Sequence, residues 1–340
     1  MRRREFIAGT AATAALSFAR EAYAQANARL PGTKRIAIVH VAEKVEDMTV
    51  NGRRSFKAYF GELNRLGYVE GKNLIVERYS ALGRLDQYQD LARAVVASQP
   101  DLIVAIGGPM ALHFKPLTNT IPILSTPADP VMVGLVTNLA RPGGNITGVS
   151  VDTGWDVWGK RLQFLNETVS NHLTNARVLA GQTTNWWNAA GAEVQKFAQQ
   201  AGTRLTVTFL GGNADRATYE RAFETIAQDG VDGLIVSDAG EHIPNRQLIV
   251  DLAAKYRLPA IYPFREFVDA GGLLSYGVDL GDVWRRLADM TDQVLRGAKP
   301  GDIPFYQQTK FELVLNRKAA RSLGLEFPPT LLTAADEVIE

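Results

Sequence analysis

Side chains that commonly perform enzymatic chemistry are scattered through this sequence rather than grouped. The four histidines are His40, His113, His172 and His242, and none forms an H-E-x-x-H pair, which is the spacing of many zinc sites. The chain has no cysteine and no G-x-S-x-G nucleophile elbow. These observations favour a protein that binds a molecule without transforming it, and we expect no metal, no cofactor and no catalytic residue.

A glycine cluster near the middle of the chain, residues 141–145 (RPGGN), could cradle a phosphate or could be a turn. A phosphate loop needs a strand, then glycines, then a helix whose first amides meet the anion. Here a helix-like apolar run, 131–140, comes first, and a strand, 146–151, comes last. The order therefore favours a turn that enters a strand, at the point where the chain leaves one lobe for another.

The elements that position these residues alternate between short apolar runs and amphipathic segments. Runs rich in Ile and Val predict buried strands, at 34–40, 73–79, 101–108, 121–126, 176–181, 203–210, 231–238 and 258–263. Helical periodicity between them predicts helices, at 52–66, 86–98, 109–115, 157–169, 188–202, 216–230 and 245–257. This alternation predicts an α/β fold of two doubly wound, Rossmann-like lobes with parallel sheets.

Ligands of such sheets bind at the carboxyl ends of the strands, so the residues that follow each strand are the candidates for a binding site. In the first half these are His40, Gly107, Gly108, Pro109, Thr126 and Asp129. In the second half they are Asn185, Trp186, Trp187, Ser237, Asp238, Tyr262, Glu266 and Tyr276. Turn amides, aromatic rings and a few carboxylates suit a small ligand that has an apolar or aromatic body and a charged end.

A structural role is the alternative for each candidate. Asp129 and Asp238 could cap local segments, and the two glycines at 107–108 could simply let the backbone turn. Tyr262 could lie in the core and Tyr276 near a crossover. Trp186 and Trp187 are adjacent, so on a helix they face different directions and at least one is expected to pack away from a ligand.

The first 24 residues have the pattern of an export signal. Three arginines precede Phe6, a short apolar stretch follows, and Ala22-Tyr23-Ala24 fits an A-x-A cleavage site. Arg3-Arg4 indicates the twin-arginine (Tat) route and a bacterial periplasmic product. The rest of the chain is close to neutral, which argues against nucleic acid or an anionic membrane as a partner.

Three long segments carry a resemblance to a known family. They are residues 129–149 (DPVMVGLVTNLARPGGNITGV), 271–304 (beginning GGLLSYGVDLGDVWRRL) and 308–340 (beginning QTKFELVLNRKAARSLG). The chain from about Lys34 onward resembles the periplasmic substrate-binding proteins of ABC transporters of the tryptophan/tyrosine type. The resemblance implies the type I periplasmic binding fold, with three crossovers and a ligand closed between two lobes.

The resemblance also implies the division of the chain and its partners. We expect 33–147 with about 277–304 in the N-terminal lobe, and 148–276 with about 305–340 in the C-terminal lobe. The expected partners are a small-molecule ligand and an ABC permease in the inner membrane, and the protein is expected to be a monomer. Family members often have a hydroxyl in the turn after the third strand. Here that turn, 107–111, has none, which favours an aromatic or aliphatic acid as ligand.

The resulting hypothesis is capture of a small aromatic or hydrophobic amino acid or carboxylate by closure of the lobes. The first lobe would hold the ligand with turn amides and Asp129, and the second with aromatic walls and the polar groups of Ser237 and Asp238. A periplasmic sensor that presents its ligand to a receptor kinase is the alternative from another class. An enzyme on the same fold is a third, whereas a transcription regulator is disfavoured because an export signal occupies the place of a DNA-binding headpiece.

Overall fold

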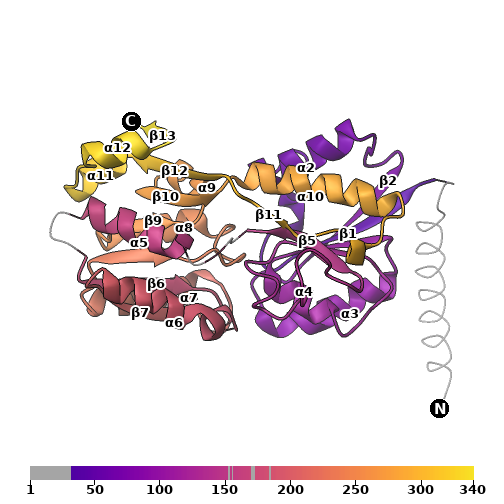
Figure 1. Cartoon of the computed structure of the whole chain (residues 1–340), viewed down its shortest axis with the longest axis horizontal. Helices are drawn as coiled ribbons and strands as arrows, with labels where there is room; N and C mark the ends of the chain where they lie inside the picture. The colour runs from indigo at the N-terminus through magenta and orange to yellow at the C-terminus, as the bar shows by residue number, and fades with distance from the viewer. Residues whose placement is uncertain (1–31, 152–153, 155, 170–172, 184) are drawn as a thin grey trace, which may run out of the picture.

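The computed structural model describes residues 32–151, 154, 156–169, 173–183 and 185–340. The predicted export signal, 1–24, lies outside the described residues. Two lobes lie side by side along the long axis of the molecule, one mostly indigo to magenta with an orange helix, and the other mostly pink to yellow (Figure 1). We call them the first and second lobe, and each is built on one sheet.

The first lobe contains a six-stranded sheet in the order β11-β5-β4-β3-β1-β2, in which all pairs are parallel. Its strands are β1 (Lys34–His40), β2 (Leu74–Ser80), β3 (Leu102–Ile106), β4 (Ile123–Ser125), β5 (Ile146–Ser150) and β11 (Tyr306–Gln307). Its helices are α2 (Arg54–Arg65), α3 (Tyr88–Ser98), α4 (Gly108–Phe114) and α10 (Leu280–Leu295). Short 3-10 turns cover Val45–Asp47, Leu85–Gln87 and Pro300–Asp302.

The second lobe contains a seven-stranded sheet in the order β13-β12-β10-β9-β8-β6-β7, in which only the β10–β12 pair of the described residues is antiparallel. Its strands are β6 (Asn175–Ala180), β7 (Arg204–Phe209), β8 (Gly233–Val236), β9 (Ala260–Tyr262), β10 (Leu274–Val278), β12 (Phe311–Asn316) and β13 (Glu337–Ile339). Its helices are α5 (Asp156–Thr168), α6 (Asn185–Gln200), α7 (Arg216–Gln228), α8 (Arg246–Lys255), α9 (Arg265–Asp269), α11 (Arg317–Leu323) and α12 (Pro329–Ala334).

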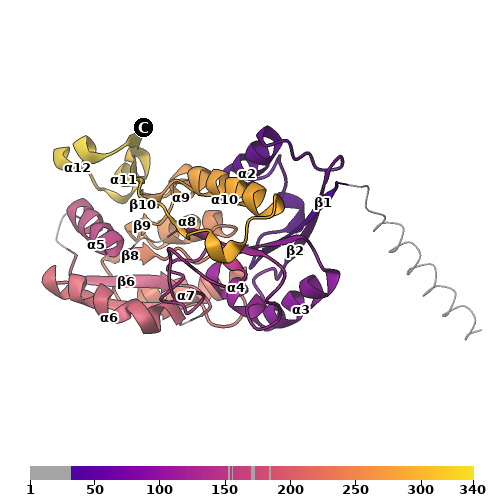
Figure 2. The same ribbon diagram turned by 45° about the vertical axis from the view of Figure 1, so that its right-hand side comes forward.

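Helices α2 and α10 pack against each other although they are far apart in the sequence, and they lie alongside in both views (Figures 1 and 2). The Trp284 ring of α10 makes an edge contact with the Phe56 ring of α2, with ring centres 4.7 Å apart. The hydroxyls of Tyr59 and Thr291 lie 2.9 Å apart. The apolar faces of both helices are buried, so hydrophobic burial holds α10 in the first lobe.

The chain passes between the lobes three times, which confirms the predicted fold class. The sheets place these passages slightly later than the boundaries predicted near 147, 276 and 304. Strand β5 of the first sheet ends at Ser150, β10 of the second ends at Val278, and β11 of the first ends at Gln307. The sheet in which each strand pairs decides where the chain leaves a lobe, and the alternation of strands and helices does not show this pairing.

The glycine cluster is a turn that leads into β5, as predicted. Gly143 and Gly144 have φ values of +67° and +66°, which glycine adopts without steric cost. The Gly143 amide donates to the Gly301 carbonyl at 3.2 Å, so the turn is fixed against the segment after α10. The strand it enters belongs to the first sheet, so the passage between lobes comes after β5 rather than within it.

The expected helix at 131–140 is wrong, because this run forms successive turns. The Asp129 carboxylate accepts hydrogen bonds from the amides of Val131 and Met132, at 2.8 and 3.0 Å. Gly134 has a φ of +73°, and the Asn138 side chain accepts from two further amides. Local side-chain hydrogen bonds and a left-handed glycine therefore replace the helical pattern.

Within the described part of the chain, no helix is both long and apolar enough to cross a bilayer.

Candidate ligand-binding site

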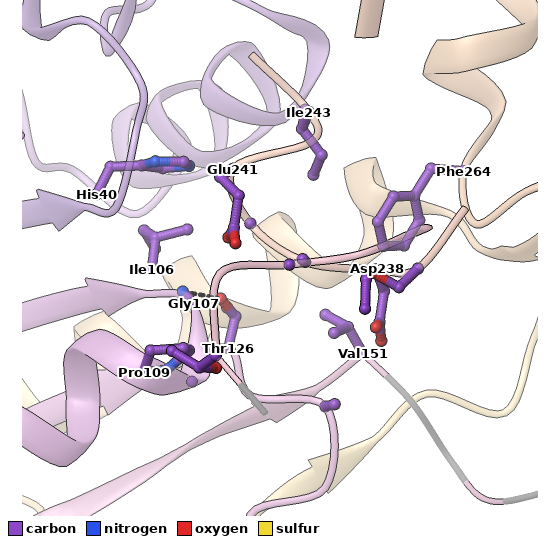
Figure 3. A pocket seen from close by; sticks show the side chains of 18 of the residues that line it. His40, Ile106, Gly107, Pro109, Thr126, Val151, Asp238, Glu241, Ile243 and Phe264 are labelled. Carbon is purple, nitrogen blue, oxygen red and sulfur yellow. Dashed lines mark hydrogen bonds between the residues drawn. The ribbon is translucent and has the colours of Figure 1, made fainter. Parts of the chain in front are cut away.

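A cavity lies between the two lobes, where loops at the carboxyl ends of both sheets meet. Figure 3 shows side chains from both lobes around one space, with His40, Gly107 and Thr126 from the first and Asp238 and Phe264 from the second. Most of its wall is apolar or aromatic, including Ile106, Leu112, Val133, Val151, Val178, Trp187, Phe209, Ile243, Phe264, Leu280, Val283 and Trp284. A concave, mainly apolar space with a few polar groups is typical of a small-molecule site.

Direct hydrogen bonds join the two lobes beside this cavity. The Gln182 side-chain amide donates to the Gly83 carbonyl at 2.6 Å, and the Tyr88 hydroxyl donates to the Gln182 Oε1 at 3.1 Å. The Ala214 amide donates to the same Gly83 carbonyl at 2.9 Å. Gly83 and Tyr88 belong to the first lobe, and Gln182 and Ala214 to the second. The lobes are therefore in direct contact beside the cavity.

The loops after β1 and β8 also approach each other closely. A Cβ atom built on Gly240 would lie 3.0 Å from the Val41 side chain and 3.8 Å from the Gly107 Cα. Val41 and Gly107 belong to the first lobe and Gly240 to the second. Glycine at position 240 therefore lets the second lobe pack tightly onto the first at the cavity edge.

His40 is a neutral hydrogen-bond donor at the first-lobe wall of the cavity. Its Nδ1 accepts hydrogen bonds from the amides of Ala42 and Glu43, at 3.0 and 2.9 Å. Burial, with a smaller contribution from the positive charge of Arg53, holds the pKa of His40 well below its ordinary value. A neutral ring whose Nδ1 is an acceptor has its proton on Nε2, so His40 can donate one hydrogen bond from that atom.

Arg53 is the cationic group of the first-lobe wall. Its side chain is 10% exposed and its Nη2 pairs with the Glu43 carboxylate. The Nε and Nη1 groups are buried and have no hydrogen-bond partner among the described residues. Burial raises the pKa of Glu43, and Arg53 opposes that rise. Burial also lowers the pKa of Arg53, but an arginine side chain stays charged in proteins.

The turn after β3 has few amides to offer. The Gly107 amide donates to the Thr126 Oγ1 at 3.3 Å, and the Met110 amide donates to the Gly107 carbonyl at 3.2 Å. Pro109 has no amide hydrogen. Gly107, Gly108, Pro109 and Thr126 all line the cavity, but the amides of Gly107 and Met110 are already bonded. The Thr126 hydroxyl still has its own hydrogen to donate.

Two carboxylates form the polar part of the second-lobe wall. Asp238 follows β8, and its Oδ2 is buried without a hydrogen-bond partner among the described residues. Burial raises the pKa of Asp238, with Arg161 opposing the rise. The Glu241 carboxylate accepts a hydrogen bond from the Gln182 backbone amide at 2.6 Å, and burial raises the pKa of Glu241 as well. Ser237 also lines the cavity, and its buried hydroxyl has no hydrogen-bond partner among the described residues. The charged groups of the second-lobe wall are thus carboxylates, whereas that of the first-lobe wall is the Arg53 guanidinium.

Trp187 is the predicted aromatic residue that reaches the cavity wall. A Cβ built on Gly191, one turn later in α6, would lie 2.7 Å from the indole Cε2. Glycine at 191 therefore makes room for the ring to lie along the helix. The side chains of Asn185 and Trp186 lie outside the described residues, so their predicted contacts stay predictions.

Four predicted residues lie away from the cavity lining. Asp129 caps the turns described above. Tyr262 is buried and stacks on Phe267, with ring centres 5.1 Å apart. Tyr276 packs between Phe164 and Phe311. Glu266 is buried on the short helix α9, and both its oxygens lack partners among the described residues. Tyr262 and Tyr276 lie within β9 and β10, and Asp129 and Glu266 come after β4 and β9. Local packing or helix direction turns each side chain elsewhere.

Other lining residues were missed by sequence reasoning. Arg53 and Ser55 lie at the start of α2, well after the end of β1, so a search of the residues immediately after strands passes over them. Glu241 and Trp284 also line the cavity. The uncapped start of α2 is the signal that could have pointed to Arg53. No group of three or more His, Asp or Glu residues that could hold a metal ion occurs in the described ranges.

Two lobes, each built on one sheet, are joined by three connecting segments of the chain and line a cavity between them. This arrangement defines the type I periplasmic binding fold. The family model for ABC transporter substrate binding proteins matches residues 39–339. The chain belongs to this family.

Individual relatives agree with this assignment. A tyrosine-binding protein of Clostridioides difficile (strain R20291) is 25% identical over 307 residues, which are 86% of this chain and 83% of the relative. Among solved structures, an ABC domain in complex with L-Trp from Streptococcus pneumonia is 22% identical with a TM-score of 0.78, and the match covers 90% of this chain and 100% of that one. A conserved domain protein from Vibrio cholerae is 24% identical with a TM-score of 0.79, covering 90% and 99%.

Proposed function

We propose that this protein is the solute-binding component of an ABC importer, and that it captures a small aromatic or hydrophobic amino acid or carboxylate between its lobes. The observation that carries the proposal is the interlobe cavity, whose wall is mainly apolar and aromatic and has few polar groups. The relatives named for tyrosine and L-Trp binding support an aromatic amino acid as the first ligand to test.

The polar groups of the cavity suit a ligand that carries both charges. The second lobe supplies the Asp238 carboxylate, which lacks a hydrogen-bond partner on its Oδ2 among the described residues. A ligand ammonium group at this carboxylate would compensate the cost of burying it. Trp187 and Phe264 line the same cavity and would contact an aromatic side chain, which contributes about 0.5–1.5 kcal/mol beyond area burial.

Closure is the proposed mechanism of capture. The hydrogen bonds of Gln182 to Tyr88 and Gly83 form only when the lobes meet. An open form that lacks them would admit the ligand, and the bound ligand would favour the closed form by its added contacts with the second lobe. In this proposal the closed form is recognised by a permease of the inner membrane, and the protein acts in the periplasm.

The proposal is tested by thermal shift and calorimetry with the purified protein. The probes are L-tyrosine, L-tryptophan, L-leucine, phenylacetate and adenine. An aromatic amino acid or acid is expected to stabilise the fold by about 2.7 kcal/mol at 100 times its Kd, and to be recovered unchanged. Stabilisation by adenine alone, or conversion of a probe to product, would contradict the proposed function.

A further inference from the structure

The start of helix α2 is an unoccupied set of hydrogen-bond donors at the wall of the cavity. Arg53 is the N-cap residue, and no described side chain caps the helix. The helix has twelve residues, and its first amides have no carbonyl within the helix to donate to. The buried Ser55 lies in this first turn and lines the cavity. The positive end of the helix dipole therefore faces the binding space.

An independent observation at the same place is the Arg53 guanidinium. It is nine-tenths buried, yet Glu43 engages only its Nη2, and Nε and Nη1 are without partners in the described ranges. Its ring contact, with Cζ 5.4 Å from the Phe56 ring centre, holds the group in position. An arginine held in this way keeps a positive charge and has N–H groups, on two edges of the guanidinium, that are free to donate to a carboxylate.

The charged groups around Arg53 do not pair with its Nε and Nη1 groups. Glu43 and Asp47 of the first lobe and Glu266 and Arg246 of the second lobe all influence the pKa of Arg53. None of them except Glu43 forms an ion pair with Arg53 within the described residues. Glu266 is itself buried without a hydrogen bond there, so it does not satisfy the guanidinium.

The rest of the first-lobe wall also presents donors rather than acceptors. His40 has its proton on Nε2, and the Thr126 hydroxyl can donate because it already accepts from the Gly107 amide. By contrast, in the turn after β3 the Gly107 amide already donates to the Thr126 Oγ1 and the Met110 amide to the Gly107 carbonyl. The donor groups of the first lobe are therefore centred on Arg53 and the start of α2, and the carboxylates of Asp238 and Glu241 belong to the opposite lobe.

We infer that Arg53 and the first turn of α2 bind the carboxylate of the ligand, and so select for a ligand that carries one. This inference rests on the proposed function and deepens it, because it assigns one charged end of the ligand to each lobe. Binding of the acid over its amide then depends on Arg53 rather than on the turn after β3. The ligand class is a carboxylic acid with an apolar or aromatic body.

The test compares matched acids and amides by calorimetry: L-tryptophan with L-tryptophanamide, L-tyrosine with L-tyrosinamide, and phenylacetate with phenylacetamide. The wild-type protein is expected to bind the acid of at least one pair 100-fold more tightly than its amide. The test variant combines Arg53→Met with Glu43→Gln, so that no buried carboxylate is left without its partner. Its preference for the acid is expected to fall at least tenfold, while its affinity for the amide stays within threefold.

Two further variants separate a binding role from a structural one. Arg65→Gln removes an exposed arginine from the same helix and is expected to leave the preference unchanged. Arg53→Lys keeps the charge but loses the directed N–H groups of the guanidinium, and is expected to retain part of the preference. This variant decides the question if the double variant does not fold. An unaltered acid preference in the folded Arg53 variants, or a wild-type protein that binds acids and amides equally, overturns the inference alone. A wild-type protein that binds none of the six probes overturns the proposed function with it.

Discussion

Replacing Asp238 by Asn removes a charge from the cavity while it preserves the size of the side chain. The Oδ2 of Asp238 is buried without a described partner, and burial raises the pKa of the carboxyl. We expect a ligand ammonium to supply the missing partner. Truncating one member of a desolvated, hydrogen-bonded charge pair costs about 2–5 kcal/mol, and a value of about 3 kcal/mol corresponds to a roughly 100-fold weaker Kd.

The same substitution is expected to stabilise the ligand-free protein, because an unpaired buried carboxylate opposes folding. The sign follows from the raised pKa. The folded state holds this proton more tightly than the unfolded state, so stability is lost as pH rises from the ordinary range of Asp toward the raised pKa. The Asn variant lacks this loss, so its Tm advantage over wild type should grow with pH across that window.

The assay is calorimetry with L-tryptophan or L-tyrosine at pH 7.5, together with melting curves of the ligand-free proteins from pH 4 to pH 8. Asp251→Asn is the matched control, because Asp251 is exposed on α8. Wild-type affinity in Asp238→Asn would refute the assignment of the ammonium to this carboxylate. Loss of affinity together with a lower Tm in the absence of ligand would instead indicate a structural role.

Three further changes test other parts of the site. Trp187→Ala removes an aromatic side chain from the cavity wall and is expected to weaken binding of L-tryptophan at least tenfold in calorimetry. Unchanged affinity in this variant would contradict a contact between Trp187 and the ligand. Gln182→Ala removes the hydrogen bonds to Tyr88 and Gly83. Because each contributes about 1 kcal/mol, the loss of both is expected to speed ligand dissociation roughly 30-fold in stopped-flow. An unchanged rate would show that the lobes close without them. Burial first, and Asp279 next, raise the pKa of Glu312 to about 7. The wild-type free energy of unfolding should therefore fall by up to about 3 kcal/mol relative to that of Glu312→Gln as pH rises from 4.5 to 7. Stability curves of the two proteins that run parallel over this range would contradict the prediction.

The alternation of strands and helices was predictable because each element carries its own periodicity. The runs at 34–40 and 231–238 are apolar enough to be buried strands, and β1 and β8 form there. The turn at 141–145 was predictable from the order of its neighbours. The run at 131–140 was not, because its apolar spacing fits a helix while Asp129 and Gly134 favour turns, and the pattern alone does not show which effect dominates.

The cavity lining was predictable where a residue ends a strand or comes shortly after one. His40 ends β1, and Gly107, Thr126 and Asp238 come within two residues of a strand end; all of these residues line the cavity. Tyr262 ends β9 in the same way, but its ring stacks in the core. Arg53 breaks the rule, because the loop after β1 returns to the cavity only when α2 packs against α10. A contact that depends on tertiary packing has no local signal in the sequence.

Closure of the lobes around a ligand is most directly tested by a distance measured between them. The chain has no cysteine, so spin labels at Arg93→Cys on α3 and Arg216→Cys on α7 would be the only ones present. Both positions are well exposed, at 63% and 71% of the side chain, and they lie on opposite lobes. We predict that a saturating aromatic amino acid shortens and narrows the distance distribution measured by double electron–electron resonance. A distribution that does not change, at a concentration where calorimetry shows full binding, would contradict capture by closure.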